Sequence, residues 1–460
     1  MAAAHDLLVL SNRGPLSFDR LPDGTFKAKR ASGGGLVVCL GPGVERNQGL
    51  WLAATTSADD LEAAREGPVD AEGFGIQPVG VDPDDYRAYY DVVANQTLWF
   101  CVHGLWDLPR RPRFDRYWWA AWHTFQAVNE RFATVAADTA AEGATVLVQD
   151  YHLALVPALL ATRRPDLRVA SFVHTPWCSA QEMSVLPDEV AQAILSGLSD
   201  GGPCGFHSRR WAAAFESCCE AHLGRPVRTF VSPAVPNVDD LRGVAASPAC
   251  DDELKRLDAL VGGCQLIVRV DRMELSKNVL RGFWAFDELL DTRPDLRGRV
   301  AFAAKVYPSR QGLAEYLAYA QEVQALAARL NRKWATGDWT PILLDTDDYY
   351  PSSVAALRRA DVLLVNPVRD GLNLVVKEGP LVNERNGVVV LSQQAGAWDE
   401  VGGHTIGVNP FDVTGTANAL GRALDAPPEE RAEQAEGLRK AIAARSPQDW
   451  FDDQRAAAGG

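Results

Sequence analysis

The stretch QLIVRVDRMELSKNVLRGFWAFDELL, residues 265–290, decides the fold class. Its first part, Leu266–Val270, is rich in β-branched residues and has the length of a strand, whereas Val279–Leu290 has the apolar spacing of a helix. A strand, a polar loop and a helix in this order form the repeating unit of a parallel sheet with crossover helices. Further predicted strands are Leu7–Leu10, Thr145–Val148, Val169–Val173, Val300–Ala304, Ile342–Leu344, Val362–Val365 and Val388–Leu391. We therefore predict an α/β protein.

The length of 460 residues exceeds what one hydrophobic core usually supports and predicts two domains. Between the halves lies Val231–Asp251, which contains three prolines and has weak periodicity, as is typical of a connection. We place the boundary near Asn237, which gives an N-terminal domain of residues 1–236 and a C-terminal domain of residues 237–445. The helical stretch Glu429–Arg445 precedes a tail, residues 446–460, that is a candidate to pack back on the N-terminal domain.

Composition argues against several classes of protein. The formal net charge of −14 disfavours nucleic acid as a partner, because binding phosphates requires clustered basic residues. No apolar run is long enough for a membrane helix and Met1–His5 does not read as a signal peptide, so we expect a cytoplasmic protein. The eight cysteines show no C-x-x-C spacing and the eight histidines no H-E-x-x-H motif, so we predict reduced thiols and no bound metal.

The first candidate site follows the strand Leu266–Val270. Ligands of parallel sheets bind beyond the carboxyl ends of the strands, so polar residues just after a strand are candidates for function. Arg272 and Lys277 lie in one such loop, five residues apart. Two cations at this spacing can clamp a diphosphate and stabilise the negative charge that grows on a departing nucleotide. The alternative is a solvated basic loop, and the position after a buried strand favours function.

The second candidate segment is NPVRDGLNLVVKE, residues 366–378, after the strand Val362–Val365. A glycine-containing turn leads into a helix whose N-terminal amides would face a diphosphate. Asp370 could accept sugar hydroxyls, and Glu378 could accept both hydroxyls of a ribose. Asn373 would also serve as the cap of this helix, and the two interpretations are compatible.

Other strand ends carry further candidate side chains. Arg13, in the motif SNRGP, suits an anion, and so does the glycine triplet 33–35, although such triplets are more often plain turns. Arg310 also follows a strand and could join Arg13 as a second anion contact. Asp150 and His174 end strands as well, but Asp150 fits a helix cap equally well, and His174 a satisfied buried imidazole.

Together these motifs resemble the trehalose-6-phosphate synthase family, the retaining glycosyltransferases of family 20. The resemblance covers nearly the whole chain. It rests on SNRGP, the glycine triplet, YYDVVANQTLW, QDYHLALVPALL, FVHTPW, RMELSKN, YPSRQ, WTPI, RDGLNLVVKE, LSQQAGAWDE and NPFD, which occur in the family's order. It implies a GT-B fold, with two Rossmann-like parallel-sheet domains facing across a cleft, and glucosyl transfer from a nucleotide glucose to glucose 6-phosphate.

The resemblance also assigns residues to the two substrates. The implied acceptor-binding residues are Arg13, Tyr90, Trp99, Asp150 and Arg310, with the two arginines gripping the 6-phosphate. The implied donor-binding residues are Gly35, Arg272, Lys277, Asp370, Gly371, Leu372, Asn373, Leu374 and Glu378, and His174 joins Asp370 at the donor sugar.

The resemblance further implies front-face substitution, because families of this fold offer no carboxylate nucleophile at the anomeric carbon. The leaving diphosphate oxygen then accepts the proton of the acceptor hydroxyl, and positioning and electrostatics dominate. The catalytic set is Arg272, Lys277, His174 and Asp370. The nucleotide sugar is a co-substrate, and we expect neither a cofactor nor a metal.

Departures from the family pattern leave the substrate open. The family's R-L-D-Y-S-K-G reads RMELSKN here, with Glu274 and Asn278 at two of its positions, and Ala54 stands where a tryptophan is often found. Residues 345–350, near the nucleotide base, do not match the commonest pattern, so UDP, GDP and ADP donors all remain open.

Two alternative functions remain open, because of these departures and because a fold does not determine a substrate. One is a pseudo-glycosyltransferase that couples a nucleotide-activated cyclitol to a phosphorylated amino-cyclitol in making an antibiotic. The other is a non-catalytic protein that senses sugar phosphates, which the intact donor residues disfavour. A homo-oligomer is compatible with each of these functions.

Overall fold

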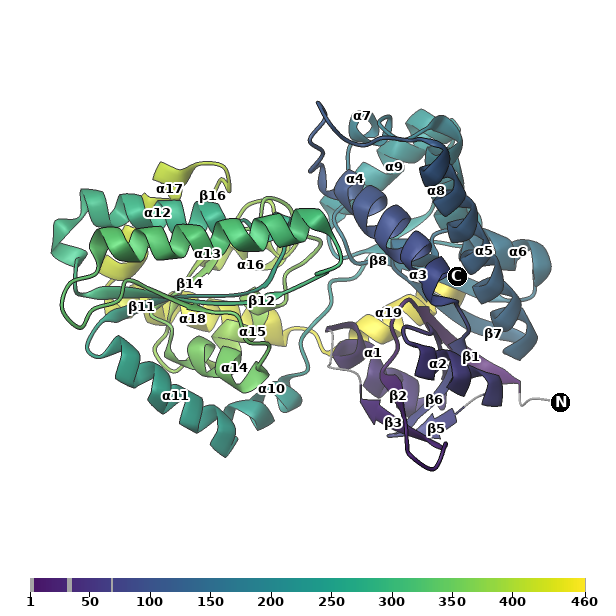
Figure 1. The fold of residues 1–460 in the computed structure, drawn as a ribbon, viewed down its shortest axis with the longest axis horizontal. Helices are drawn as coiled ribbons and strands as arrows, with labels where there is room; N and C mark the ends of the chain where they lie inside the picture. The colour runs from purple at the N-terminus through teal and green to yellow at the C-terminus, as the bar shows by residue number, and fades with distance from the viewer. Residues whose placement is uncertain (1–3, 31–34, 68, 460) are drawn as a thin grey trace. The chain divides into compact units, whose positions relative to one another are not determined.

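The computed structural model describes residues 4–30, 35–67 and 69–459, and the chain divides into two compact units (Figure 1). Unit 1 comprises Met1–Ala234 together with Pro447–Gly460, and unit 2 comprises Val235–Ser446. The division falls between Ala234 and Val235, whereas the sequence placed it near Asn237. Both units are built on parallel sheets with helices between the strands, which confirms the predicted α/β class.

The sheet of unit 1 has eight strands in the order β10-β9-β8-β7-β1-β4-β6-β5. All neighbours are parallel except β5, which runs antiparallel to β6 at one edge. The strands are β1 His5–Ser11, β4 Leu50–Ala54, β5 Val69–Ala71, β6 Phe74–Val79, β7 Ala140–Gln149, β8 Arg168–Val173, β9 Cys204–Phe206 and β10 Thr229–Val231. A separate antiparallel hairpin is formed by β2 Leu16–Arg20 and β3 Phe26–Arg30.

The helices of unit 1 include one π-helix, η2, at Arg87–Leu98. The others are α1 Gly35–Arg46, α2 Ala58–Ala63, η1 Ala64–Glu66, α3 Pro83–Tyr86, α4 Trp99–His103, α5 Arg116–Thr139, η3 Tyr151–Leu153, α6 Val156–Arg163, α7 Ala180–Met183, α8 Asp188–Ser199, α9 Arg209–Leu223 and α19 Pro447–Gly459.

The sheet of unit 2 has six parallel strands in the order β13-β12-β11-β14-β15-β16. They are β11 Gln265–Met273, β12 Val300–Pro308, β13 Ile342–Asp345, β14 Val362–Val365, β15 Val388–Ser392 and β16 Ile406–Val408. The helices are α10 Val238–Ala245, α11 Pro248–Val261, η4 Leu275–Lys277, α12 Val279–Thr292, η5 Pro294–Leu296, α13 Ala314–Trp334, α14 Tyr350–Arg359, α15 Val375–Val382, α16 Trp398–Val401, η6 Gly402–His404, α17 Val413–Asp425 and α18 Pro428–Ala443.

Helices cover both faces of this sheet, which explains its continuously apolar strands. Figure 1 shows α12 and α13 on one side of β11 and β12, and α11 and α14 on the other. On the α12 side, Phe283 and Phe286 meet Phe302 of β12 edge to face. The core therefore holds the strands rigidly and leaves the loops after their carboxyl ends to carry function.

The predicted connection Val231–Asp251 is mostly helical, which corrects the sequence interpretation. Only residues 232–237 link the last strand of unit 1 to α10. The Asn237 side chain accepts from the Asp240 amide and starts α10, and the Ser247 side chain accepts from the Cys250 amide and starts α11. Pro248 occupies the first turn of α11, where it costs no hydrogen bond, so proline here marks a helix start and not a linker.

The C-terminal helix α19 belongs to unit 1, where it packs on α1, β7 and β8. Trp450 and Phe451 are both buried, with exposed fractions of 1% and 0%. The ring of Phe451 lies over Gly43, where a Cβ atom would approach it to 2.5 Å. The absence of a side chain at Gly43 thus allows the two helices to meet.

Two further observations concern the described part of the chain as a whole. None of its helices combines the length and the hydropathy that a bilayer-crossing segment needs. All eight cysteines are free thiols, and all but Cys264 are buried, which agrees with the prediction of structural thiols.

Candidate functional site

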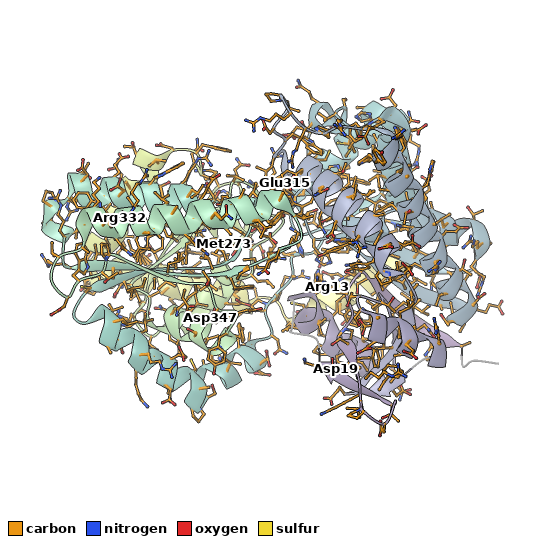
Figure 2. All side chains as sticks on the ribbon, in the orientation of Figure 1. Arg13, Asp19, Met273, Glu315, Arg332 and Asp347 are labelled. Carbon is orange, nitrogen blue, oxygen red and sulfur yellow. The ribbon has the colours of Figure 1, made fainter. Side chains whose placement is uncertain are left out.

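The loops after β11 and β14 bring the two predicted donor segments together, because these strands are parallel neighbours in the sheet. The Lys277 ammonium lies 2.6 Å from Oδ2 of Asp370. Asn373 donates from Nδ2 to the same oxygen, at 3.2 Å. Figure 2 marks Met273, the last residue of β11, where this edge of the sheet begins.

Lys277 is held in its charged form by its neighbours. Burial of the side chain lowers the pKa, but the carboxylates of Asp370 and Asp271 outweigh that effect and keep the pKa of Lys277 above its ordinary value. The side chain is 13% exposed, so the ammonium is fixed in place and can still be reached from solvent. The residue therefore offers a preorganised positive charge.

Glu274 lies between two of the predicted arginines. Its Oε1 is 3.1 Å from Nη1 of Arg272 and 3.3 Å from Nη1 of Arg310, and the Ser309 hydroxyl donates to it at 3.1 Å. The Glu274 side chain is almost fully buried, whereas Arg272 is half exposed. The pKa of Arg272 is raised chiefly by this carboxylate. Glu274, like the aspartate of the family pattern, thus supplies an anion that screens the repulsion between two cations.

Asn278, the other departure in this loop, preserves the course of the backbone. It has φ 61°, a left-handed conformation that asparagine tolerates better than most residues. Its Nδ2 donates to the carbonyl oxygens of Asn366 and Pro410, at 2.9 and 2.8 Å. These two bonds tie the loop after β11 to the loops after β14 and β16.

Arg269 supports the same loop from inside the sheet and was missed by sequence reasoning. It is fully buried in β11, and its Nη2 donates to Oδ2 of Asp271 and to the carbonyl of Lys277, both at 2.7 Å. The signal was present, since a charged residue inside an otherwise apolar strand requires a buried partner. Sequence alone could not say that the partner was the Lys277 backbone.

The segment 370–378 forms the predicted turn and helix. Asn373 has φ 79°, and its Oδ1 accepts from the Val376 amide at 3.3 Å. The cap position of α15 is Leu374, one residue later, which corrects the interpretation of Asn373 as the cap. Leu372 is buried and Leu374 half-buried, so these residues offer a ligand chiefly their backbone amides.

Gly396 lies against this segment so closely that only glycine fits. Its amide donates to the Asp370 carbonyl at 3.0 Å, and a Cβ atom at Gly396 would be 1.8 Å from the Gly371 carbonyl oxygen. Gly396→Ala is therefore expected to lower the free energy of unfolding by about 3 kcal/mol, because the backbone must move to relieve the overlap. Urea unfolding of the two proteins would measure the difference.

Gly403→Ala is the matched control for this prediction. Gly403 lies in η6 of the same unit, and a Cβ atom there meets nothing within 4 Å. If the two variants were equally stable, the close approach of Gly396 to Gly371 would have no energetic consequence.

Glu378 is a half-buried carboxylate in the first turn of α15. Burial alone raises its pKa to about 7, because no described residue pairs with it strongly enough to oppose the shift. A carboxylate held in this way is typical of a ligand-binding position, where the partner arrives with the ligand.

This shift predicts a pH-dependent stability. Between the ordinary pKa of 4.5 and the folded value of about 7, the unfolded chain releases the Glu378 proton while the folded protein keeps it. The free energy of unfolding therefore falls across this window as pH rises. Glu378→Gln, which does not titrate, is expected to be more stable than the parent by about 3 kcal/mol at pH 8 and by little at pH 4.5. Thermal melts at both pH values would check this; an equal difference at both would contradict it.

In unit 1, three of the predicted acceptor residues lie along one line of side chains. The Arg13 guanidinium is 5.6 Å from the centroid of the Tyr90 ring. Tyr90 stacks on His152 at 5.5 Å, and Nδ1 of His152 is 3.5 Å from Oδ2 of Asp150. A cation, two stacked rings and a carboxylate thus follow one another at the carboxyl ends of β1 and β7. Figure 2 labels Arg13, the exposed end of this line.

Asp150 has a strained backbone, with φ 70° and ψ 165°, a region that residues other than glycine rarely adopt. Its side chain makes no cap bond to η3, which corrects the interpretation of Asp150 as a helix cap. Its Oδ1 accepts instead from the His174 amide at 3.2 Å. Burial would raise the pKa of Asp150, but the hydrogen bond and charge of His152 lower it to about 2. Such strain at a strand end points to a functional position.

Three further predicted residues, His174, Trp99 and Gly35, also lie in unit 1. Both ring nitrogens of His174 have protein partners, Gln149 at 3.0 Å and His207 at 3.3 Å, so the sugar contact implied by the resemblance stays a prediction. Trp99 is buried at 2% exposure and stacks on His103 at 4.1 Å. Gly35 is exposed and begins α1, whereas its neighbours Gly33 and Gly34 lie outside the described residues.

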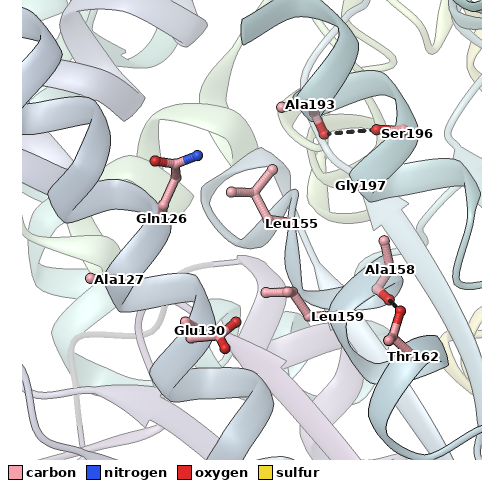
Figure 3. A pocket seen from close by; sticks show the side chains of 10 residues that line it. All are labelled: Gln126, Ala127, Glu130, Leu155, Ala158, Leu159, Thr162, Ala193, Ser196 and Gly197. Atoms are coloured by element: carbon pink, nitrogen blue, oxygen red, sulfur yellow. Dashed lines mark hydrogen bonds between the residues drawn. The ribbon is translucent and has the colours of Figure 1, made fainter. Parts of the chain in front are cut away.

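A separate hollow of about 520 Å³ lies on unit 1 between α5, α6 and α8 (Figure 3). Leu155, Leu159 and Gly197 are among its lining residues, and none of the predicted site residues lines it. Across the described ranges of the chain, no three His, Cys, Asp or Glu side chains are grouped so that they could hold a metal ion.

Comparison with known proteins gives one consistent family. The family model described as Glycosyltransferase family 20 matches residues 5–458. The chain is 31% identical over 487 residues to the trehalose-6-phosphate synthase of Mycolicibacterium smegmatis, a match that covers 100% of this chain and 94% of that protein.

The solved structures that resemble this chain point to the same family. An E. coli structure bound with UDP-2-fluoro glucose has a TM-score of 0.86 and 26% identity, with 98% of each chain covered. The UDP-forming α,α-trehalose-phosphate synthase of Burkholderia xenovorans in complex with glucose-6-phosphate has a TM-score of 0.85 and 26% identity, covering 99% of this chain and 100% of that one. The fold is therefore GT-B, with two Rossmann-like domains, and the chain belongs to glycosyltransferase family 20.

Proposed function

We propose that this protein is a retaining glucosyltransferase that moves glucose from UDP-glucose or GDP-glucose to glucose 6-phosphate and forms α,α-trehalose 6-phosphate. The observation that carries the proposal is the Lys277–Asp370 pair, together with Arg272, which is one of the last two residues of β11 and does not lie in the loop where the sequence placed it. A basic pair and a carboxylate at the end of a parallel sheet suit a diphosphate joined to a sugar. Likeness to a structure bound with UDP-2-fluoro glucose and to one in complex with glucose-6-phosphate supports the choice of substrates.

The donor would be held by unit 2. Arg272 and Lys277 would bind the diphosphate, together with the backbone amides of residues 371–374 at the start of α15. Asp370 would accept hydroxyls of the glucose. Glu378 would accept the two ribose hydroxyls, whose hydrogen bonds would favour the charged carboxylate against the burial that raises its pKa.

The acceptor would be recognised through its phosphate by Arg13 and Arg310, and through its ring by Tyr90, Trp99 and Asp150. Arg310 is bound to Glu274 and to the Tyr316 hydroxyl, so its guanidinium is already oriented. Fixed orientation matters because a planar guanidinium binds phosphate best with two parallel hydrogen bonds.

The proposed reaction balances without a protein nucleophile. The bond between the anomeric carbon and the diphosphate oxygen breaks, and the acceptor hydroxyl oxygen bonds to that carbon on the same face. The hydroxyl proton passes to the departing diphosphate oxygen, while Arg272 and Lys277 stabilise its charge. These two cations supply the positive charge that the step requires, so we expect activity to persist in the presence of a metal chelator.

The test is direct. Purified protein is incubated with glucose 6-phosphate and, in separate reactions, with UDP-, GDP- or ADP-glucose, and products are identified by mass spectrometry. A phosphorylated disaccharide with one donor supports the proposal and names the base. Absence of that product with every donor would reject it. Turnover of a nucleotide-activated cyclitol with a phosphorylated amino-cyclitol alone would favour the pseudo-glycosyltransferase instead.

A further inference from the structure

A chain of side-chain hydrogen bonds runs through unit 1 from the end of β9 to the C-terminal helix. Nε2 of His207 is 3.3 Å from Nδ1 of His174, and Nε2 of His174 is 3.0 Å from Oε1 of Gln149. Gln149 in turn donates from Nε2 to Oε1 of Gln454 at 2.9 Å. The three other members of this chain are all buried, with exposed fractions of 5% for His207, 0% for Gln149 and 1% for Gln454.

The direction of every bond in this chain is determined from one end. The backbone amide of Ala234, which can only donate, lies 3.3 Å from Nδ1 of His207. That nitrogen is therefore the acceptor, and the proton of a neutral His207 is on Nε2. It donates to Nδ1 of His174, which leaves the His174 proton on Nε2, and that proton is donated to Gln149. The Gln149 oxygen accepts and its nitrogen donates to Gln454.

Packing fixes the planes of the same rings. Trp450 of α19 stacks on His207, with centroids 6.1 Å apart and an interplanar angle of 28°. It meets His174 edge to face at 5.8 Å and 71°. Phe172 meets His207 edge to face at 4.8 Å and also contacts Trp450, with centroids 5.3 Å apart. The C-terminal helix therefore supplies both a ring that orients the imidazoles and, through Gln454, the end of the hydrogen-bond chain.

The charges around His174 affect whether its ring is protonated, but they do not select one of the two neutral tautomers. The Asp150 carboxylate nearby favours a protonated, cationic His174, whereas burial and the neighbouring His152 oppose it and the pKa of His174 is lowered overall. Burial, however, does not choose between the two neutral tautomers. Only the donor at Nδ1 and the acceptor at Nε2 make that choice.

We propose that His207 and Gln454 are positioning residues that hold His174 as a neutral imidazole with its proton on Nε2, the form that can donate to a hydroxyl of the donor sugar. The inference rests on the proposed function and on the contact of His174 with the donor sugar that the family resemblance implies. A sugar hydroxyl that reaches His174 shares this proton with Oε1 of Gln149, which lies 3.0 Å from Nε2. Molecules whose His174 carries its proton on Nδ1 have no donor at Nε2. The apparent affinity for the sugar therefore falls in proportion to the fraction of molecules in that tautomer.

The first experiment separates the hydrogen bond of His207 from its packing. His207→Phe keeps a ring against Trp450 and Phe172 but removes the donor to His174. His207→Gln removes the ring but returns an amide N–H near the position of Nε2. Long-range ¹H–¹⁵N spectra of ¹⁵N-histidine-labelled protein report the tautomer, and His174→Asn assigns the His174 signals.

The expected result is that the parent protein and His207→Gln show His174 as the Nε2–H tautomer, whereas His207→Phe shows a mixture. With His207→Phe, kcat/KM for the nucleotide glucose is expected to fall about tenfold, the cost of roughly one hydrogen bond. The KM for glucose 6-phosphate is expected to change little, and His207→Gln is expected to restore most of the loss.

Gln454 gives an independent pair of variants if His207→Phe does not fold. Gln454→Met removes the acceptor for Gln149, so the Gln149 amide can turn over and present its nitrogen to His174. Gln454→Glu retains an acceptor oxygen at the same reach. The methionine variant is expected to shift the His174 tautomer and to lower kcat/KM for the donor, and the glutamate variant to do neither.

Two outcomes would overturn the inference. One is that His207→Phe and Gln454→Met leave the His174 nitrogen signals as in the parent protein. The other is that both variants shift those signals while the transfer rate with the donor stays unchanged. Failure of the parent protein to transfer glucose from any donor would instead overturn the proposed function and the sugar contact with it, and the spectra would still decide the tautomer.

Discussion

Lys277→Ala is expected to lower kcat for glucosyl transfer by about 1,000-fold, because the variant loses the positive charge that would face the departing diphosphate. In the parent protein this charge is held by Asp370 at 2.6 Å and needs no reorganisation when the bond breaks. The KM for glucose 6-phosphate is expected to change little, since Lys277 serves the donor. Steady-state kinetics with each substrate varied in turn would measure both constants.

Two further variants make this prediction sharper. Lys255→Ala removes an exposed lysine of α11 whose partner is Asp252, and it is expected to be neutral. Asp370→Ala combined with Lys277→Ala is expected to cost less than the sum of the two single changes, because each single change leaves the other charge unpaired. A rate within about tenfold of the parent for Lys277→Ala would remove this residue from the mechanism.

Arg310→Ala is expected to raise the KM for glucose 6-phosphate by about 100-fold, because the acceptor phosphate loses a bidentate, charge-assisted partner. The donor KM should change less. Glu274 still balances Arg272 in this variant, so the donor clamp keeps its geometry. Initial rates with glucose 6-phosphate and with unphosphorylated glucose would test the assignment, since Arg310→Ala should leave the weak reaction of glucose unaffected.

Arg332→Ala is the control for a general effect of charge, since Arg332 lies in the last turn of α13 and is exposed (Figure 2). Equal losses with glucose and glucose 6-phosphate in Arg310→Ala would mean that Arg310 supports the loop around Glu274 and does not read the phosphate.

Most of the fold could be predicted because its central strands are continuously apolar and of ordinary length. Each strand predicted from the sequence lies within a strand of the structure, and Leu266–Val270 lies inside β11. The strands missed include β9, β10 and β16, which have three residues each. Three residues are too few to show a period, and such segments become strands because a neighbouring strand offers a free edge.

The sequence predicted only those residues of the candidate site that directly follow the end of a strand. Lys277 and Asp370 were chosen separately for that reason, and the parallel sheet brings them together. Glu274 was noticed as a departure, but its contact with Arg310 joins residues 36 positions apart and depends on the length of its side chain. Gln454 could not be predicted from the sequence, because its hydrogen bond to Gln149 spans 305 positions and no local pattern encodes it.

Unit 1 is built from two distant parts of the chain, and this affects the order in which the two units fold during synthesis. Residues up to Ala234 leave the ribosome long before Pro447–Gly459, so the surfaces of α1, β7 and β8 that later receive Trp450 and Phe451 stay uncovered while unit 2 is made. Unit 2 is continuous and can fold as soon as it emerges. The first half of the protein is thus the last to be completed, and any lesion that removes the final helix leaves a finished unit 2 attached to an unfinished unit 1.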